Sequence, residues 1–286
     1  MISEAEYHKP TTTESACELL AEMPEAIVVA GGQSLGLLTK EGIITPETLV
    51  DITEIDALNR IEHAGDELHI GATTTHRTIE QSDLVAEEIP VLQEAASHIA
   101  DIQIRNAGTI GGVAAYADPT AEYPLVFLVL DAEIESRTVE GTETYQARDF
   151  FQGYYQSALD PDELVTEVRI PTPDDNQGIG YEKLAYREND RAVVNVVSSV
   201  TVEDGTCTDA HIAVGSVTDV PVLAEDAAAE LIGTELTDAD IAGAAAAARE
   251  EVPVEPDPSI SIEYREDMVH NLVENTIEDA HANLQR

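Results

Sequence analysis

Residues 104–124 read IRNAGTIGGVAAYADPTAEYP, and this stretch decides the fold more than any other part of the chain. At its centre, Thr109-Ile110-Gly111-Gly112 joins a hydroxyl group to two adjacent glycines, so the backbone can turn sharply and approach a ligand closely. Polar side chains flank this turn, with Arg105 and Asn106 before it and Asp118 and Glu122 after it. The pattern is typical of a glycine nest, in which backbone N–H groups receive an anion.

A second glycine turn lies upstream, at AGGQSL, residues 30–35. It follows the apolar run 27–30, which predicts a buried strand. Gln33 and Ser34 would add uncharged donors to the same concavity. The spacing matches neither the G-x-G-x-x-G pattern nor the P-loop, and by itself it allows a plain tight turn equally well. Two nests together predict a ligand the size of a dinucleotide.

The charge balance points to a salt-rich environment. The 286 residues include 57 acidic and 14 basic side chains, which gives a formal net charge of −43. The acidic residues are spread along the whole length, which favours a solvated surface over a normal core and not a disordered tail. At about 1 M salt the Debye length falls to roughly 3 Å, which screens their repulsion. We therefore expect a halophilic protein that binds neither nucleic acid nor anionic membranes, with an acidic protein of ordinary salt as the alternative.

The two cysteines and the N-terminus indicate the compartment. Cys17 and Cys207 stand far apart without a CxxC pattern, so a disulfide framework, a zinc site and an iron–sulfur ligand set are all unsupported. The N-terminal MISEAEYHKP does not resemble a signal peptide, and the longest apolar run, residues 125–130, is too short to span a bilayer. These features predict a cytoplasmic protein whose metal clusters, if any, belong to another chain.

Short strands and helices alternate over the first half, a pattern that favours an α+β fold over a Rossmann repeat. A helix is expected from a cap at Thr13 or Ser15 to Pro24, and another over residues 85–99. Strands are expected at residues 48–52 and 68–71. The run 124–139 and the turn Glu140-Gly141-Thr142 predict strands that meet at a hairpin.

The stretch PTPDDNQGIG, residues 171–180, has the composition of a linker, and we place a domain boundary there. Beyond it the sequence predicts strands and helices in a small α/β sandwich. The strands are expected at residues 181–186, 196–202 and 211–217, and the helices at residues 238–250 and 263–280.

Four ordered blocks resemble the FAD-binding medium subunit of molybdenum hydroxylases, the family of xanthine dehydrogenase and aerobic carbon-monoxide dehydrogenase. The blocks are AGGQSL (30–35), GATTTHR (71–77), the stretch 104–124 and YEKLAYRENDRA (181–192). The resemblance covers nearly the whole chain. It implies that residues 1–172 form a two-part FAD-binding domain of the vanillyl-alcohol-oxidase/PCMH-like type, with two α+β subdomains split near residues 55–60. Residues 177–284 would form the smaller α/β C-terminal flavoprotein domain.

The resemblance also implies which residues contact the cofactor, with both glycine nests on the FAD pyrophosphate. The implied set is Ala30, Gly31, Gly32, Gln33, Ser34, Leu35, Thr109, Ile110, Gly111, Gly112, Val113, Asp118, Glu122, Val165 and Lys183. Lys183 near the flavin N1/C2=O edge would stabilise the anionic reduced ring and raise its potential. The ordinary alternatives are solvated positions for Glu122 and Lys183 and a turn-forming role for Asp118.

Other polar residues are expected to support the site. Residues 73–75 would cap a helix, and His76 is interpreted as a structural, hydrogen-bonded histidine and not as a general base. Arg105 and Asn106 resemble family residues that hold the TIGG loop.

Three further features surround these blocks. Arg187 and Asp190 would form a structural pair near Lys183. Leu37 stands where the family commonly has a proline, and Val113 where it commonly has an asparagine. These departures put cofactor affinity in doubt, and not the fold.

The resemblance implies an electron-transfer subunit of an oxidoreductase. A large partner subunit would hold the molybdenum–pterin cofactor and oxidise the substrate, and a small one would carry [2Fe–2S] clusters that deliver electrons to FAD on this chain. No catalytic or metal-binding residue is then expected here, and the sequence specifies neither the substrate nor the electron acceptor nor the stoichiometry. A stand-alone FAD- or nucleotide-binding protein without redox turnover and a self-contained flavin oxidase of the vanillyl-alcohol type stay open, although the large cap domain and covalent attachment of the latter are not evident.

Overall fold

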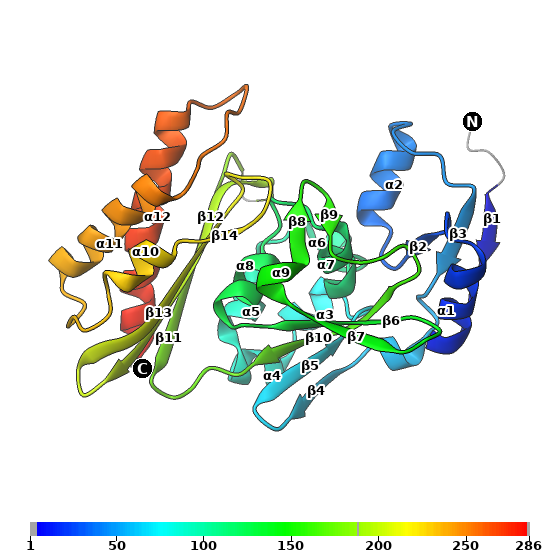
Figure 1. Cartoon of the computed structure of the whole chain (residues 1–286), viewed down its shortest axis with the longest axis horizontal. Helices are drawn as coiled ribbons and strands as arrows, with labels where there is room; N and C mark the ends of the chain where they lie inside the picture. The colour runs from blue at the N-terminus through cyan, green and yellow to red at the C-terminus, as the bar shows by residue number, and fades with distance from the viewer. Residues whose placement is uncertain (1–4, 188, 285–286) are drawn as a thin grey trace.

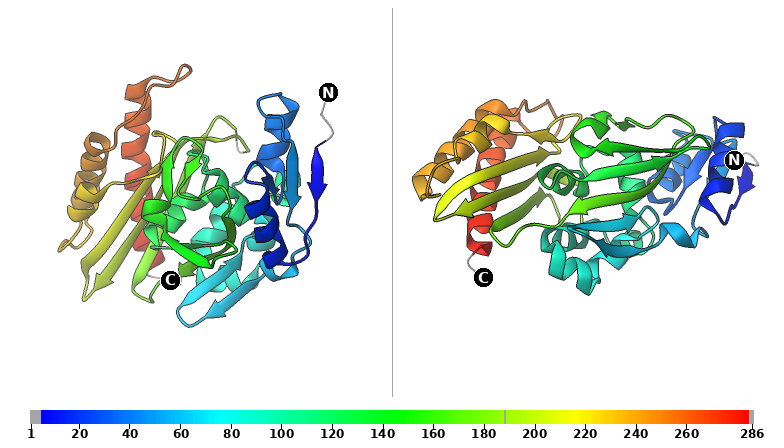
Figure 2. Two further views of the ribbon diagram at one scale, coloured as in Figure 1. Left: turned by 45° about the vertical axis from the view of Figure 1, so that its right-hand side comes forward. Right: turned by 60° about the horizontal axis from the view of Figure 1, so that its bottom comes forward.

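The computed structural model describes residues 5–187 and 189–284. Its strands form three sheets and a two-stranded ribbon with helices packed against them, so the predicted α+β class is confirmed. The three sheets lie in a row along the longest dimension of the molecule, from the N-terminal sheet at one end to the C-terminal sheet at the other (Figure 1, Figure 2).

The N-terminal unit is a parallel sheet in the order β1-β3-β2. Its strands are β1 (Glu6–His8), β2 (Ile27–Val29) and β3 (Thr48–Asp51). The predicted first helix is present as α1 (Thr13–Glu22), but its cap is Thr12, whose hydroxyl accepts a hydrogen bond from Ser15 N–H. A second helix, α2 (Gln33–Lys40), follows β2 and was not predicted, because an eight-residue helix with an internal glycine leaves little periodicity to detect.

The central unit is an antiparallel sheet in the order β4-β5-β10-β6-β7, which the chain enters through the 3-10 helix η1 (Asp56–Leu58). Its strands are β4 (Ile61–Ala64), β5 (Glu67–Gly71), β6 (Glu133–Arg137), β7 (Thr142–Gln146) and β10 (Leu164–Pro171). Its other elements are α3 (His76–Glu80), α4 (Asp83–Glu88), α5 (Pro90–Ser97), α6 (Ile102–Arg105), α7 (Ile110–Tyr116), α8 (Tyr123–Val129), α9 (Ala147–Phe150), β8 (Phe151–Gly153) and β9 (Gln156–Ser157). One sheet face is apolar, with Val168 opposite Ile70 and Ile134, and it packs against these helices.

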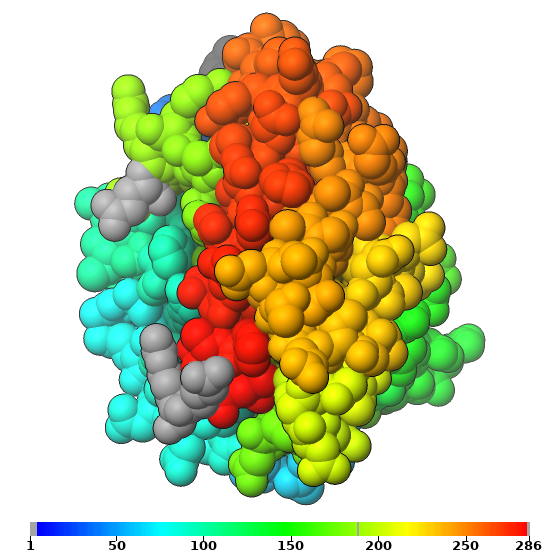
Figure 3. Space-filling view, turned by 90° about the vertical axis from the view of Figure 1, so that its left-hand side faces the viewer, coloured from blue at the N-terminus to red at the C-terminus, as the bar shows by residue number. Residues whose placement is uncertain are grey.

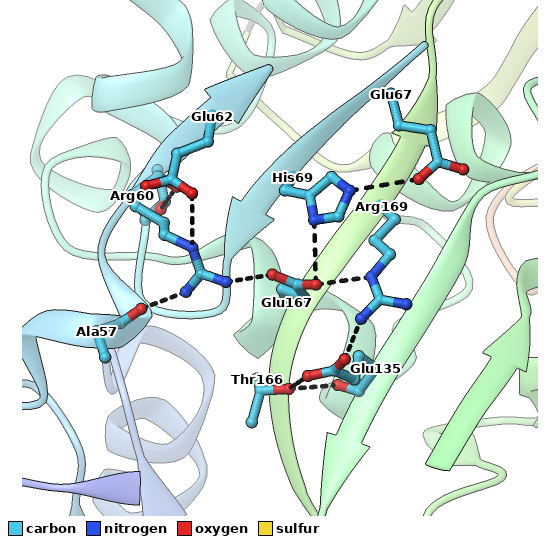
Figure 4. Close-up of polar contacts among 10 residues, drawn as sticks. Ala57, Arg60, Glu62, Glu67, His69, Glu135, Thr166, Glu167 and Arg169 are labelled. Carbon is cyan, nitrogen blue, oxygen red and sulfur yellow. Dashed lines mark hydrogen bonds and ion pairs between the residues drawn. The ribbon is translucent and has the colours of Figure 1, made fainter. Parts of the chain in front are cut away.

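The alternate side chains of the central sheet form an ion-pair network on its other face (Figure 4). Glu167 on β10 is 3% exposed and lies at the centre of this network. It accepts a hydrogen bond from Arg169 Nε at 2.6 Å, lies 3.3 Å from His69 Nδ1 and pairs with Arg60. Arg169 also pairs with Glu135 on β6, so the network ties β10 to both of its neighbours.

Two predicted elements of this region are wrong. Residues 123–129 form the helix α8 and not a strand, because a short, wholly apolar run fits a buried helix as well as a buried strand; the hairpin is confined to β6 and β7. The helix predicted over residues 85–99 is two helices, α4 and α5. They break at Ile89 because the proline that follows disfavours helical backbone there.

The C-terminal unit is an antiparallel sheet of β11 (Gln177–Ala185), β12 (Ala192–Glu203), β13 (Thr206–Gly215) and β14 (Val222–Leu223). Its helices are α10 (Glu225–Ala229), α11 (Asp238–Glu251) and α12 (Ile262–Asn283), so both predicted helices are confirmed. Figure 3 shows α11 and α12 side by side on the outer surface. The sheet also contacts α5 and α8 of the central unit. Since β10 ends at Pro171 and β11 begins at Gln177, only residues 172–176 connect the sheets, fewer than the linker composition suggested.

Within residues 5–187 and 189–284, no helix combines the length and apolar character that crossing a membrane requires. The same residues contain no cluster of three His, Cys, Asp or Glu side chains that could hold a metal ion. Cys17 and Cys207 are both buried free thiols.

Candidate functional site

A cavity of about 650 Å³ lies where the three units meet. This volume falls within the roughly 300–1,000 Å³ that small-molecule sites occupy. Its lining residues come from β2 and α2, from α7 and the loop that follows it, and from β11 and the loop before β12. In Figure 1, α7 lies near the centre of the molecule and α2 to its right. Every predicted cofactor contact except Ile110 lines the cavity: Ala30, Gly31, Gly32, Gln33, Ser34, Leu35, Thr109, Gly111, Gly112, Val113, Asp118, Glu122, Val165 and Lys183.

The first glycine turn is the N-terminus of α2. Gly32 adopts a left-handed backbone with φ of 66° and begins the helix without a side-chain cap. The N–H groups of Gln33, Ser34 and Leu35, in the first turn, therefore have no partner within the helix. Together with the helix dipole, such groups form a ready site for an anion. The sequence predicted the turn but not the helix behind it.

The two glycine turns touch each other. A Cβ atom added to Gly31 would lie 2.0 Å from the carbonyl oxygen of Ala107 and 2.7 Å from Cα of Gly108. Only a residue without a side chain allows this approach. The contact brings the turn before α2 against the turn before α7 and makes one continuous floor, which we call the cradle.

The N–H groups of the second glycine turn are already hydrogen-bonded to other groups of the protein. Gly112 N–H donates to Thr109 Oγ1 at 3.1 Å, Ile110 N–H to Thr74 O at 3.1 Å and Gly111 N–H to Ala72 O at 3.0 Å. This turn therefore offers a ligand a close backbone surface and few free donors. The side chain of Ile110 is fully buried in the hydrophobic core, so its predicted contact with the cofactor stays a prediction that only its backbone could fulfil.

Glu122 and Lys183 form a buried ion pair on the cavity wall. Lys183 Nζ lies 2.7 Å from Glu122 Oε1 and donates to His98 O at 2.9 Å. The Lys183 side chain is 3% exposed and the Glu122 side chain 9%. Burial raises the pKa of Glu122, and the neighbouring ammonium opposes that rise. The solvated positions considered for both residues are wrong. With Glu122 ionised, the pair presents almost no net charge, so the cation predicted at Lys183 has its counter-ion beside it.

Asp118 forms the predicted turn. Its Oδ1 accepts hydrogen bonds from Thr120 N–H at 2.9 Å and Thr120 Oγ1 at 2.7 Å. Its Oδ2 lies 3.4 Å from Arg191 Nη2, a contact that the sequence did not indicate. A backbone hydrogen bond runs from Asp190 N–H to Arg187 O at 3.0 Å, and no ion pair between the side chains of the predicted Arg187–Asp190 pair is found among the described residues.

His76 is buried against Tyr123, with the ring centroids 5.4 Å apart in an edge-on arrangement. Desolvation lowers the pKa of His76 to about 4, so the ring is neutral at pH 7. Thr75 caps α3 as predicted, by accepting from Thr78 N–H at 3.1 Å. Among the described residues His76 Nδ1 has no hydrogen-bond partner, so the expectation of a satisfied histidine is wrong at that atom.

Arg105 supports the cavity wall from outside. It donates to Ile99 O at 3.0 Å and Ala100 O at 2.8 Å, and its Nε pairs with Glu80 at 3.0 Å. Ile99 and Ala100 line the cavity, so Arg105 fixes part of its wall.

Sequence reasoning missed the apolar end of the cavity. The residues that line it include Ile27, Val29, Leu38, Ile44 and Ile52. Their signal was the apolar run before the first glycine turn, which we interpreted only as a strand. An apolar end beside an anion site suits a ligand with a flat ring attached to phosphate.

Comparisons with known proteins cover the whole described fold. A family described as the FAD binding domain in molybdopterin dehydrogenase matches residues 3–173, and one described as the CO dehydrogenase flavoprotein C-terminal domain matches residues 179–280. The nicotine 6-hydroxylase medium subunit of Paenarthrobacter nicotinovorans is 36% identical over 276 residues, which cover 96% of this chain and 97% of the relative. The carbon monoxide dehydrogenase medium chain of Afipia carboxidovorans is 37% identical over 278 residues, or 97% and 96%.

Solved structures agree with these relatives. A chain of the reconstituted CO dehydrogenase from Oligotropha carboxidovorans superposes with a TM-score of 0.95 at 36% identity and covers 99% of both chains. A chain of quinoline 2-oxidoreductase from Pseudomonas putida 86 gives a TM-score of 0.95 at 29% identity over 100% of both.

Proposed function

We propose, because this chain belongs to the family of FAD-binding medium subunits of molybdenum hydroxylases, that its cavity holds one FAD through which electrons leave the assembled enzyme. The observation that carries this proposal is the convergence of both glycine turns and the Glu122–Lys183 pair on one cavity. When bound, the cofactor would supply the redox chemistry for electrons that come from iron–sulfur clusters on a partner chain. The residues of this chain bind it, orient it and limit its contact with water.

The residues that line the cavity divide it into three parts. The open N–H groups of Gln33, Ser34 and Leu35 would bind the pyrophosphate, over the floor where Gly31 meets Ala107. The apolar end at Ile27, Leu38 and Ile44 would take the adenine ring. The isoalloxazine would then lie toward Glu122 and Lys183, where Lys183 can donate to its polar edge while the pair stays close to neutral.

The partners follow from the family. Relatives are named as medium chains of larger enzymes, so this chain works with a large molybdenum-cofactor subunit and a small iron–sulfur subunit. The named enzymes act on nicotine, carbon monoxide and quinoline. Because similar medium subunits serve such different substrates, substrate choice belongs to the large subunit.

We also propose the domain division at residues 1–172 and 177–284, with the first domain split near residues 55–60. Three features support it: the connection at residues 172–176, the position of η1 between the first two sheets, and family matches that end at 173 and begin at 179.

We infer that the chain works in a salt-rich cytoplasm. Its net charge of −43 supports a halophilic protein, and its two buried free thiols suit a reducing compartment. Transfer from molar KCl to dilute buffer should lower the melting temperature, because the carboxylate repulsion is no longer screened.

The proposal that electrons leave through this FAD is tested on the assembled enzyme, purified in molar KCl. An activity screen first identifies a substrate that reduces the enzyme. The visible absorption of the flavin should bleach when the reducing substrate is added and recover with an electron acceptor. A preparation whose clusters are reduced while the flavin stays oxidised would reject the role and favour a non-redox flavoprotein.

A further inference from the structure

Two Lys or Arg side chains line the cavity among the described residues, and they differ in how fully they are paired. Lys183 is buried and lies 2.7 Å from Glu122. Arg191, in the loop between β11 and β12, is 59% exposed and lies 3.4 Å from its acidic neighbour Asp118. The guanidinium of Arg191 is therefore the cation on the cavity wall that can still take an anionic ligand.

Asp118 is a weak partner for Arg191. Charge-assisted N–H···O bonds are usually about 2.7–2.9 Å long, and the separation here is 3.4 Å. The other oxygen of Asp118 already holds Thr120 through two hydrogen bonds. Since a guanidinium has five donors in a planar fork, Arg191 keeps donors for a ligand.

Arg191 lies beside the second glycine turn. Its guanidinium is close to the phenols of Tyr116 and Tyr155, whose ring centroids are 4.9 Å apart. Tyr116 follows Gly112 by four residues in α7, so both lie on one helix face. Gly112, Tyr116 and Arg191 all line the cavity. The cation therefore lies on the same side of the cavity as the turn whose N–H groups are used internally.

We propose that Arg191 binds the pyrophosphate of FAD and supplies, on the α7 side, the donors that the second glycine turn does not offer. The inference rests on the proposed function, namely that the cavity holds FAD. A guanidinium can bind two phosphate oxygens at once, and a local cation offsets the repulsion that a chain of charge −43 exerts on a dianion. Because Arg191 comes from the C-terminal unit, the cofactor links that unit to the α2 anion site of the N-terminal unit.

The test compares Arg191→Ala with Arg187→Ala, an exposed arginine of the same loop that does not line the cavity, so both variants lose one positive charge. FAD affinity is measured by titration in molar KCl, and ADP, which carries a pyrophosphate but no flavin, is measured by displacement of FAD. Arg191→Ala should weaken FAD and ADP by the same factor, about 10- to 100-fold for a lost charged hydrogen bond. Arg187→Ala should change neither, and Arg191→Lys should recover part of the loss.

Two results would overturn the assignment. A loss of FAD affinity without a loss of ADP affinity would place Arg191 on the flavin ring. Unchanged FAD affinity in Arg191→Ala, with a wild-type chain that binds FAD, would remove Arg191 from the site and leave the proposed function standing. Failure of the wild-type chain to bind FAD would instead reject the proposed function on which this inference rests.

Discussion

Replacement of Gly31 by alanine tests the cradle most directly. The added Cβ would lie 2.0 Å from Ala107 O, 2.6 Å from Ala107 C and 2.7 Å from Gly108 Cα, all backbone atoms that cannot rotate away. Relief requires the two glycine turns to separate by about 1 Å, and overpacking of this kind typically costs about 1–3 kcal/mol. If FAD needs the closed floor, its affinity should fall about 5- to 150-fold, at 1.4 kcal/mol per tenfold.

Gly36→Ala is the matched control. Gly36 also lies in α2, but a Cβ there would meet no atom within 4 Å. This variant should be stabilised by about 0.5–1 kcal/mol, because alanine is the better helix residue, and its FAD affinity should not change. The assay is FAD titration followed by flavin fluorescence, with thermal unfolding of both variants. A Gly31→Ala chain that binds FAD as tightly as the wild type would refute the cradle, and an equal loss in Gly36→Ala would show that the effect is not specific to the contact.

Four further variants test the buried groups of the site and the ion-pair network of the central sheet. Glu122→Gln should raise the flavin reduction potential by about 30 mV, because the charge of Lys183 is then no longer compensated; this shift equals a tenfold change for a two-electron couple. Lys183→Met should lower the potential. If spectroelectrochemistry shows no opposite shifts in the two variants, the flavin lies elsewhere. His76 has a folded pKa of about 4, below its ordinary 6.5, so stability is complete above pH 6.5 and about 3 kcal/mol should be lost as the pH falls to 4. His76→Phe should remove that part of the acid sensitivity in denaturant unfolding, and an identical pH profile would contradict the buried neutral ring. Glu167→Gln should lower the unfolding free energy by about 1–3 kcal/mol, because two arginines lose their shared negative charge and one of its two acceptor oxygens. A chain as stable as the wild type would show that the network contributes little.

The sequence predicted the two glycine turns better than the helices around them. The two glycine turns could be found because adjacent glycines beside hydroxyl and amide side chains have a local physical meaning, and they do meet at Gly31. The apolar run before Asp131 was misassigned, because a helix buried on all sides has no polar face and leaves no periodicity to separate it from a strand.

Charge partners were the least predictable feature. The pairing of Glu122 with Lys183 joins residues 61 positions apart, and Asp118 meets Arg191 across the boundary between two sheets. In a chain with 57 acidic residues, composition makes every carboxylate look solvated, and only the tertiary fold shows which ones are buried. The hydrogen bonds from the N–H groups of the second turn to Ala72 O and Thr74 O could not be predicted either, because these acceptors lie far away in the sequence.

The central claim is that this chain holds one FAD in the cavity between its three units. The most direct measurement is a visible-absorption titration with FAD in molar KCl, on the isolated chain and on the chain assembled with its partner subunits, followed by dithionite reduction and reoxidation in air. The account predicts saturation at about one FAD per chain, the single site that a cavity of this size accommodates, with bands that bleach and return. A folded chain that takes up no FAD, alone or assembled, would contradict it.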